Sequence, residues 1–438
     1  MPALKRIAIV GGGFSGAMLA ARLAETGLAS ILINRTPDFG LGVAYSTPFE
    51  GHLLNVRSNR MTAVEGRPDD FVDWLQAHHP ELGTAHDFAP RKVYGDYLRD
   101  RLSTVETAHP GLIERRVATV AAITADGLTL SDGQTIQADA VVLCTGNPAP
   151  NAASTHGERV ISDPWAPGAL ERIGAADDVV IVGTGLTMVD MIQSLVARGW
   201  TGKATSLSRR GLTPRPHNPT PDTPTPLPPE ALSGPLSQRL AAVRALAAKG
   251  CWRCVMEAYR PITADLWGQA DADLRARMVR HLRPWWDVHR HRIAARIGWS
   301  LDALKAQGRL TIVAGRLGRV ETAPDHVTVH WTPRGQGGGG AATAAPLTAN
   351  WMIDCTGPAH SAAADPLTAP LIASGRARLD PLRLGLDLDA KGRVLHADGA
   401  PDPALFVLGP PARAAFWETI AVPDIRKRIE DVVAALAA

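Results

Sequence analysis

The segment IAIVGGGFSG, residues 7–16, has the residue types and spacing of a turn that binds a diphosphate. Gly11, Gly13 and Gly16 fit the pattern G-x-G-x-x-G, which combines a tight turn, close approach of a pyrophosphate and close packing of a helix on a strand. The start of that helix offers N–H groups and a partial positive charge to the phosphates. Asn34 stands where an acidic residue usually contacts the ribose, and it can still accept a hydrogen bond. Arg35 beside it could pack on adenine or meet a phosphate; alternatively, both residues only begin a surface loop.

A second turn of this kind follows in IVGTGLTMVD, residues 181–190. Gly183 and Gly185 match the first two glycines, but Met188 replaces the third, so we expect this helix to stand slightly farther from its strand. The next strand ends in Arg209 and Arg210, at the position that contacts the ribose. Arginine there suits a 2′-phosphate and favours NADP(H) over NAD(H), whereas the alternative is a solvated basic strand end.

The elements that must position these turns are predicted to occur twice. Buried strands are expected at residues 6–10 and 29–34, with a helix at 15–26 between them. The same order of strand, glycine turn, helix and strand restarts near residue 178. Each copy then passes through an excursion and a hairpin region to a strand that ends in Cys-Thr-Gly. An architecture that repeats a dinucleotide-binding unit is expected to hold two dinucleotides.

Three segments interrupt the second copy. Residues 213–229 contain so many prolines that we expect an extended loop or lid. Residues 231–305 are expected to be helical, and the glycine-rich residues 333–346 to form a flexible tip. A strand in ALFVLG and a helix from about residue 423 are expected to end the chain.

The bulk composition excludes several classes of protein. The chain has 438 residues, which suggests two or three domains, and its net charge of +3 gives no global nucleic-acid or membrane footprint. No apolar run approaches the length of a membrane helix, and the N-terminus lacks a signal-peptide pattern. Four cysteines are not a disulfide framework, and no cluster has metal-ligand spacing. We therefore expect a cytoplasmic protein with no metal, nucleic-acid or membrane partner, and leave its oligomeric state open.

These motifs, together with stretches such as HLLNVRSNRM, PRKVYGDYLRDRL, RPWWDVHRHR and FWETIAVPDIR, resemble flavoproteins with two dinucleotide-binding domains. That group includes the flavin-containing and N-hydroxylating monooxygenases, and the resemblance extends over nearly the whole chain. It implies FAD in the first domain and a nicotinamide coenzyme in an inserted second domain. Thr145 with Gly146, and Thr356 with Gly357, lie in Cys-Thr-Gly segments that look like the Ala-Thr-Gly signature at the crossover between the two domains.

The resemblance also points to residues near the flavin. It places the HLLNV segment close to the isoalloxazine ring, where His52 and Asn55 are candidate catalytic residues; a purely structural histidine is the alternative for His52. The C-terminal flavin motif often ends in Gly-Asp, but here prolines follow Gly409. This departure puts the usual carboxylate contact in doubt, and backbone N–H groups near Trp417 could replace it.

The segment RHLRPWWDVHRHRIAAR, residues 280–296, contains a third candidate catalytic residue, His289. Pro284 suits the first turn of a helix, on which Trp285 and His289 share a face. The segment could form a wall of the substrate or nicotinamide site, with arginines that meet phosphates or an acidic substrate. The alternative is a solvated basic helix whose tryptophans pack into the domain.

Cys251 and Cys254 form a C-x-x-C pair, which a flavin disulfide reductase could use as a redox relay. Against this, the pair is expected inside a helical run rather than at a helix start, and the resembling family typically has no cysteine pair there. Cys144 and Cys355 are expected to be small core residues.

The fold expected is α/β, with two Rossmann-like three-layer domains, the second inserted in the first. The FAD domain is predicted at residues 1–152 and 340–438, and the NAD(P)H domain, with the proline-rich loop and helical block, at 153–339. The predicted function is an FAD- and NADPH-dependent monooxygenase that uses O₂ to hydroxylate a small molecule, with a nitrogen centre as one candidate position. The alternatives are a disulfide reductase that uses Cys251 and Cys254, and a dinucleotide-binding sensor without turnover.

Overall fold

The computed structural model describes residues 5–82, 84–147, 157–335, 344–357 and 361–438. In the described chain, the first unit contains a sheet of six strands in the order β15-β16-β7-β1-β2-β3, of which β16, β7, β1, β2 and β3 run parallel. The strands of this sheet are β1 Arg6–Val10, β2 Ala29–Asn34, β3 Ile113–Val117, β7 Ala140–Leu143, β15 Arg393–Leu395 and β16 Pro401–Val407. Strands β1, β2 and β7 are almost wholly apolar because both faces of the sheet are covered.

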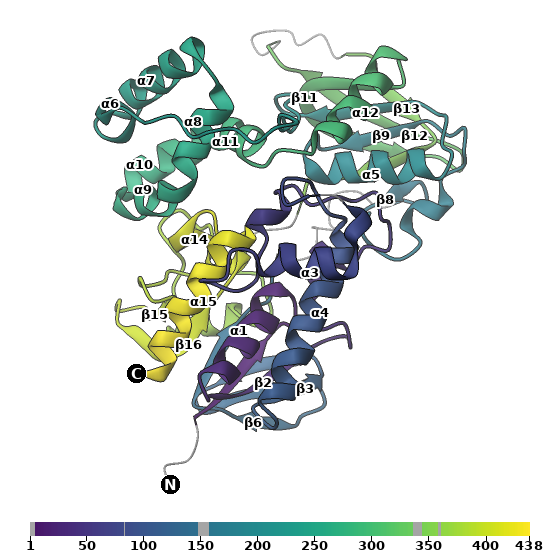
Figure 1. The fold of residues 1–438 in the computed structure, drawn as a ribbon. Helices are drawn as coiled ribbons and strands as arrows, with labels where there is room; N and C mark the ends of the chain where they lie inside the picture. The colour runs from purple at the N-terminus through teal and green to yellow at the C-terminus, as the bar shows by residue number, and fades with distance from the viewer. Residues whose placement is uncertain (1–4, 83, 148–156, 336–343, 358–360) are drawn as a thin grey trace.

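Two layers cover this sheet. Three helices pack on one face through a single apolar core, namely α1 Phe14–Glu25, α4 Arg91–Ala108 and α15 Val422–Ala437 (Figure 1). The opposite face packs against a small antiparallel sheet of β4 Val120–Thr124, β5 Gly127–Leu130 and β6 Thr135–Gln137. Asp132 and Gly133 lie in the turn between β5 and β6. Shorter helices are α2 Gly42–Tyr45, α3 Asp70–His78 and α13 Ala369–Ala373.

The second unit has a sheet in the order β13-β12-β11-β10-β9-β14-β8. Its strands are β8 Val160–Ile161, β9 Val179–Val182, β10 Ala204–Ser208, β11 Leu310–Thr322, β12 Val327–Pro333, β13 Leu347–Ala349 and β14 Trp351–Asp354. Helices α5 Leu186–Ala197 and α12 Ala295–Ala306 cover one face of it. The parallel order β14-β9-β10-β11 repeats the order β7-β1-β2-β3 of the first sheet, so the predicted internal repeat is confirmed in the described residues.

The expected boundary at residue 340 is too early. Strands β13 and β14, residues 347–354, hydrogen-bond within the second sheet, where β14 pairs with both β9 and β8. In the first unit, β7, the strand before Cys-Thr-Gly, likewise pairs in parallel with β1, the strand that leads into the glycine turn. The chain therefore returns to the first unit only after Asp354.

Residues 229–290 form what we call the helical block, inserted between β10 and β11. Its helices are α6 Pro229–Leu232, α7 Leu236–Lys249, α8 Trp252–Tyr259, α9 Thr263–Gln269, α10 Ala272–Arg277 and α11 Arg283–Arg290. Figure 1 shows the block apart from the second sheet and next to α14, Arg413–Phe416, of the first unit. The proline-rich residues 213–228 contain no helix or regular strand, as expected. Of the expected glycine-rich tip, residues 336–343 lie outside the described residues.

No helix in the described chain combines the length and the apolar character needed to cross a membrane.

Candidate functional site

The first glycine turn packs so closely against the neighbouring strands that a side chain on Gly11 would not fit. Gly11 has a φ of 108°, and a Cβ there would lie 2.3 Å from the carbonyl oxygen of Cys144. Its N–H donates to the Ile33 carbonyl at 2.8 Å, while Gly13 begins α1 as the N-cap residue. A Cβ on Gly16 would lie 1.9 Å from the Gly11 carbonyl oxygen, so α1 packs directly on the turn. This is the backbone arrangement that brings a pyrophosphate to a helix N-terminus.

The second turn repeats this geometry. Gly183 has a φ of 113°, and its Cβ would lie 2.2 Å from the carbonyl oxygen of Cys355. Its N–H donates to the Leu207 carbonyl at 2.8 Å, the counterpart of the bond from Gly11. Gly185 is the N-cap of α5, and Met188, at the position of the third glycine, is fully buried. In both turns, the N-cap residue of the helix is a glycine, and no side chain caps the N-terminal N–H groups.

The residues at the end of the second strand, where a dinucleotide's ribose is expected to bind, differ in charge between the two units. Asn34 ends β2 and turns back on the first turn, where its Oδ1 accepts from the Gly12 N–H at 3.2 Å and its Nδ2 donates to the Thr36 carbonyl at 2.9 Å. Arg35 beside it is exposed. After β10, Arg209 is exposed and Arg210 partly buried. The second unit therefore presents two cations where the first presents a neutral amide.

The Cys-Thr-Gly segments lie beside the two turns at the carboxyl ends of the parallel strands. The Cys144 N–H donates to the Val10 carbonyl at 2.8 Å and the Cys355 N–H to the Val182 carbonyl at 2.7 Å, while both thiols are buried. The following residues, Thr145 with Gly146 and Thr356 with Gly357, reach the surface next to each turn. They are placed to line the edge of a dinucleotide site, where ligands bind in this class of sheet.

His52 lies at the contact between the two units rather than in an open site. It is buried; its Nε2 donates to the Asp190 carbonyl on α5 at 3.0 Å and lies 2.9 Å from the Ser194 hydroxyl, and its Nδ1 accepts from the Thr47 hydroxyl at 2.7 Å. Burial lowers its pKa in spite of the Asp190 carboxylate, so the ring is neutral near pH 7. Both ring nitrogens have partners, which favours the structural role over the catalytic one.

Asn55 lies in the same segment as His52 and accepts a hydrogen bond from a second histidine, His217. Its backbone carbonyl accepts a hydrogen bond from Nε2 of His217, at 3.1 Å, in the proline-rich segment. Burial, with the Arg292 charge, lowers the pKa of His217 to about 3, so this histidine stays neutral and donates. The partly buried Asn55 also lines a small cavity between the 51–55 loop and α5. Of the two candidates in HLLNV, Asn55 is the one that lines this cavity.

Two ion pairs that the sequence did not predict hold the units in place. Arg91, the first residue of α4, makes a two-pronged bond to Asp190 on α5, at 2.9 and 3.2 Å, and donates to the Leu53 carbonyl at 2.9 Å. Arg290, at the end of α11, lies 3.3 Å from the carboxylate of Glu418, to which the Trp286 indole also donates at 2.7 Å. Asp190, as the one charged residue of α5, was the available sequence signal for such a pair.

Gly409 and Trp417 lie at the C-terminal edge of the first sheet. Gly409 follows β16, and a Cβ there would lie 2.4 Å from the hydroxyl oxygen of Ser15 on α1, so this segment touches the first turn's helix. Trp417 has a left-handed φ of 42° and stacks on Trp267 of α9 with ring centroids 4.5 Å apart. A bulky residue in this conformation is strained, and such strain is often found at functional sites.

His289 lies on the inner side of α11, half-buried, next to Trp252 of α8 with ring centroids 4.8 Å apart. Its Nδ1 donates to the Trp285 carbonyl at 2.7 Å, since a carbonyl can only accept. Burial lowers its pKa, so Nε2 of the neutral ring is an acceptor. His289 lines both an apolar cavity in the helical block and a polar hollow beside the second unit.

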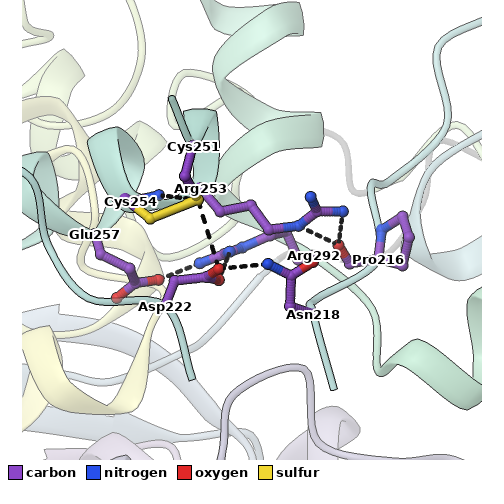
Figure 2. Close-up of a disulfide and its surroundings, with 8 residues drawn as sticks. All are labelled: Pro216, Asn218, Asp222, Cys251, Arg253, Cys254, Glu257 and Arg292. Atoms are coloured by element: carbon purple, nitrogen blue, oxygen red, sulfur yellow. Dashed lines mark hydrogen bonds and ion pairs between the residues drawn. A yellow bond between two sulfur atoms is a disulfide. The ribbon is translucent and has the colours of Figure 1, made fainter. Parts of the chain in front are cut away.

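Cys251 and Cys254 are joined in a disulfide (Figure 2), and the expectation that the pair lies inside a helical run rather than at a helix start is wrong. Cys251 is the N-cap of α8, and its sulfur accepts from the Cys254 N–H at 3.1 Å. A helix N-terminus is where redox-active C-x-x-C pairs lie. Asp222 lies 3.7 Å from the Cys251 sulfur, and the three side chains bring possible metal-ligand atoms within 4.8 Å of one another. The location is thus more favourable to redox chemistry than the sequence suggested.

A buried set of charges surrounds this disulfide. Arg292 is paired with both Asp222 and Glu257, while Arg253 donates to the Pro216 carbonyl at 2.8 Å (Figure 2). Burial alone would raise the pKa of Glu257, but Arg260, Arg292 and Arg60 lower it to about 2. Arg292 is therefore neutralised by two carboxylates, whereas Arg253 is held by a backbone carbonyl.

Comparison with known proteins agrees with this geometry. Residues 8–148 match a family model described as FAD-NAD(P)-binding, and no curated protein sequence matches the chain. The ornithine N-hydroxylase KtzI from Kutzneria sp. 744 superposes with a TM-score of 0.69 at 14% identity over 99% of both chains. The ornithine hydroxylase PvdA from Pseudomonas aeruginosa gives 0.66 at 16% identity, again over 99% of both chains. The thioredoxin reductase of T. acidophilum gives 0.53 at 12% identity, covering 99% of this chain and 100% of that one.

At these identities the likeness is one of fold. The chain therefore has the α/β fold of flavoproteins with two Rossmann-like dinucleotide-binding units, and its residues 8–148 match the FAD-NAD(P)-binding family.

Proposed function

We propose that the chain is an FAD-dependent, NADPH-using monooxygenase that acts on a small molecule. The observation that carries the proposal is the pair of glycine turns, one in each unit. The two turns make equivalent backbone hydrogen bonds, and in each a Cβ on the first glycine would clash with a cysteine carbonyl oxygen. The solved structures with this fold include KtzI with reduced FAD, NADP⁺ and L-ornithine. O₂ as co-substrate and the cytoplasmic location stay predictions, and the oligomeric state stays open.

The residues present fit the two coenzymes. FAD would lie with its pyrophosphate at Gly11 and Gly13, and its flavin would supply the redox chemistry. NADPH would lie with its pyrophosphate at Gly183 and Gly185. The chain's own part is to hold the two units in a fixed relation, which the Arg91–Asp190 pair and buried His52 do at their contact. Asn55 is the side chain of the HLLNV segment that we assign to the flavin edge, and His289 is assigned to the substrate side.

The activity test is a purified protein that is yellow and oxidises NADPH faster than NADH. The double variant Arg209→Ala/Arg210→Ala is expected to lose about tenfold or more in kcat/KM for NADPH and little for NADH, because one or two charge-assisted bonds to the 2′-phosphate disappear. Arg198→Ala, at an exposed position at the end of α5 away from the glycine turn, is the control and should leave both values unchanged. Equal loss with both coenzymes would place the two arginines outside the 2′-phosphate site.

A flavin disulfide reductase is the second candidate, favoured by the disulfide at the start of α8 and by the shared fold with a thioredoxin reductase. If the chain is a monooxygenase, Cys254→Ser should keep NADPH oxidation within about twofold of the parent rate, since the pair then takes no electrons. Loss of turnover in Cys254→Ser and Cys251→Ser, with flavin reduction by NADPH intact, would establish the reductase instead. Coenzyme binding without flavin reduction in stopped-flow mixing would indicate the sensor.

A further inference from the structure

The helical block encloses an apolar cavity that the proposed chemistry has not used. It has a volume of about 500 Å³ and lies among α7, α8, α9 and α11, with Trp417 of the first unit at one side. This volume is within the range of small-molecule sites. Six aromatic side chains line it, namely Trp252, Tyr259, Trp267, Trp285, Trp286 and Trp417. The remaining lining is mostly aliphatic, from residues such as Leu240, Val243 and Val255.

The charged groups that line the cavity are of one sign. They are Arg239, Arg244 and Arg283. The histidines His281 and His289 also line the cavity. Among the described residues that line it there is no aspartate or glutamate, so a ligand ammonium group would meet no counter-charge. Arg283 has its own partner in Asp287, at 3.5 Å, but Arg244 is exposed and Arg239 is held by a backbone carbonyl. An amino acid with a second amino group is therefore poorly matched to this cavity, whereas a carboxylate is well matched.

The cavity also adjoins the segment assigned to the flavin. Trp267 is 1% exposed, stacks on Trp417 and donates its indole N–H to the Ala414 carbonyl at 2.8 Å. This contact fixes the strained Trp417 at the edge of the cavity, in the C-terminal segment that touches α1 through Gly409. On the other side, Trp252 and His289 separate the cavity from the polar hollow beside the second unit, which Arg215 and Lys305 line.

We propose that this cavity is the substrate pocket, and that it takes an apolar molecule, acyl or arylalkyl, with an anionic or neutral polar end. The substrate assignment rests on the proposed function, but the ligand class rests only on the lining of the cavity. The aromatic wall buries the apolar body by the hydrophobic effect, and the arginines of α7 meet the polar end at the mouth. In this chain the helical block thus selects a substrate class different from the diamino acid in the KtzI structure.

The test compares two probes with the same ten-carbon chain, decanoate and decylamine, together with L-ornithine, by isothermal titration calorimetry of the purified protein. Decanoate should bind. Decylamine and ornithine should bind at least about fivefold more weakly, because no carboxylate lines the cavity to pair with their ammonium groups. Decylamine or ornithine binding as tightly as decanoate would overturn the ligand class, as would the absence of decanoate binding.

Two variants locate the binding. Ala247→Trp fills the cavity and should weaken decanoate at least about tenfold, whereas Ala245→Trp, on the exposed side of the same helix, should not. Arg239→Glu/Arg244→Glu, at partly or fully exposed positions, should reverse the preference toward decylamine. If neither Ala247→Trp nor Arg239→Glu/Arg244→Glu changed decanoate binding, the assignment of the ligand to this cavity would be wrong.

Flavin absorbance and anaerobic reduction by NADPH are recorded on the same samples. Decanoate binding without flavin reduction would contradict the proposed function and leave the pocket standing. Flavin reduction without decanoate binding would contradict the pocket and leave the proposed function standing. With both present, decanoate is expected to perturb the flavin absorbance of the parent protein and not that of Ala247→Trp.

Discussion

A Gly11→Ala protein is expected to purify without flavin, whereas the parent protein is expected to be yellow. The added Cβ would lie 2.3 Å from the Cys144 carbonyl oxygen, at a residue whose φ of 108° an alanine rarely adopts. The turn must open, and the N–H groups at the start of α1 then move away from the pyrophosphate position. The measurement is the ratio of flavin absorbance at about 450 nm to protein absorbance, before and after incubation with excess FAD.

Two further glycine variants separate strain from site. Gly27 also has a positive φ, of 82°, but a Cβ there meets nothing within 4 Å, so Gly27→Ala should cost some stability and keep the flavin. Gly183→Ala should keep the flavin and lose its reduction by NADPH, because the same clash occurs in the second unit. A yellow Gly11→Ala protein, or a colourless Gly183→Ala protein, would contradict our assignment of the two coenzymes to the two units.

Glu418→Leu is expected to lower the free energy of unfolding by about 3–5 kcal/mol, the usual cost of leaving one partner of a buried ion pair without its counter-charge. Glu418 is 2% exposed and Arg290 3%, and the Trp286 indole loses its acceptor as well. Urea denaturation followed by tryptophan fluorescence measures the change. Asp302→Asn, which removes an exposed ion pair with Lys305, is the control and should change stability by less than about 1 kcal/mol.

Two observations would support this explanation. The double variant Arg290→Met/Glu418→Leu should recover part of the loss, because no charge is then left unpaired. Burial alone would raise the pKa of Glu418, but Arg290 and His291 lower it below its ordinary value of 4.5. Its contribution is therefore present above pH 4.5 and is lost as the pH falls through the lowered pKa. A parent–variant difference that stayed constant on acidification would argue against the ion pair.

The repeated units could be predicted because local rules determine them. Gly11 and Gly183 stand at strand-to-helix turns where only glycine fits, and apolar runs mark the buried strands on either side. The boundary near residue 340 was wrong because the sequence does not say which sheet a returning strand joins. That choice depends on pairing between β14 and β9, strands more than 160 residues apart in the chain.

The candidate site was harder to predict than the fold. The partners of His52 include Asp190 and Ser194, and those of Glu418 include Trp286 and Arg290, all distant in sequence. Glu418 lies in a stretch that marked the family resemblance, but nothing local distinguished a buried ion pair from a ligand contact. The start of α8 at Cys251 was missed because alanine-rich and basic residues precede the cysteine, and no helix breaker other than Gly250 separates α7 from α8.

The position of the helical block has a mechanical consequence. By sequence the block lies between β10 and β11 of the second unit, yet Arg290 and Trp286 join it to Glu418 of the first, and Arg60 joins it there again through Glu257. Arg57 also holds the carbonyl of Asn218. If the second unit rotates during a catalytic cycle, the block stays with the first unit, and the chain must bend near residues 211–215 and 293–295. Such a rotation would break the Arg91–Asp190 pair and leave the walls of the cavity in place.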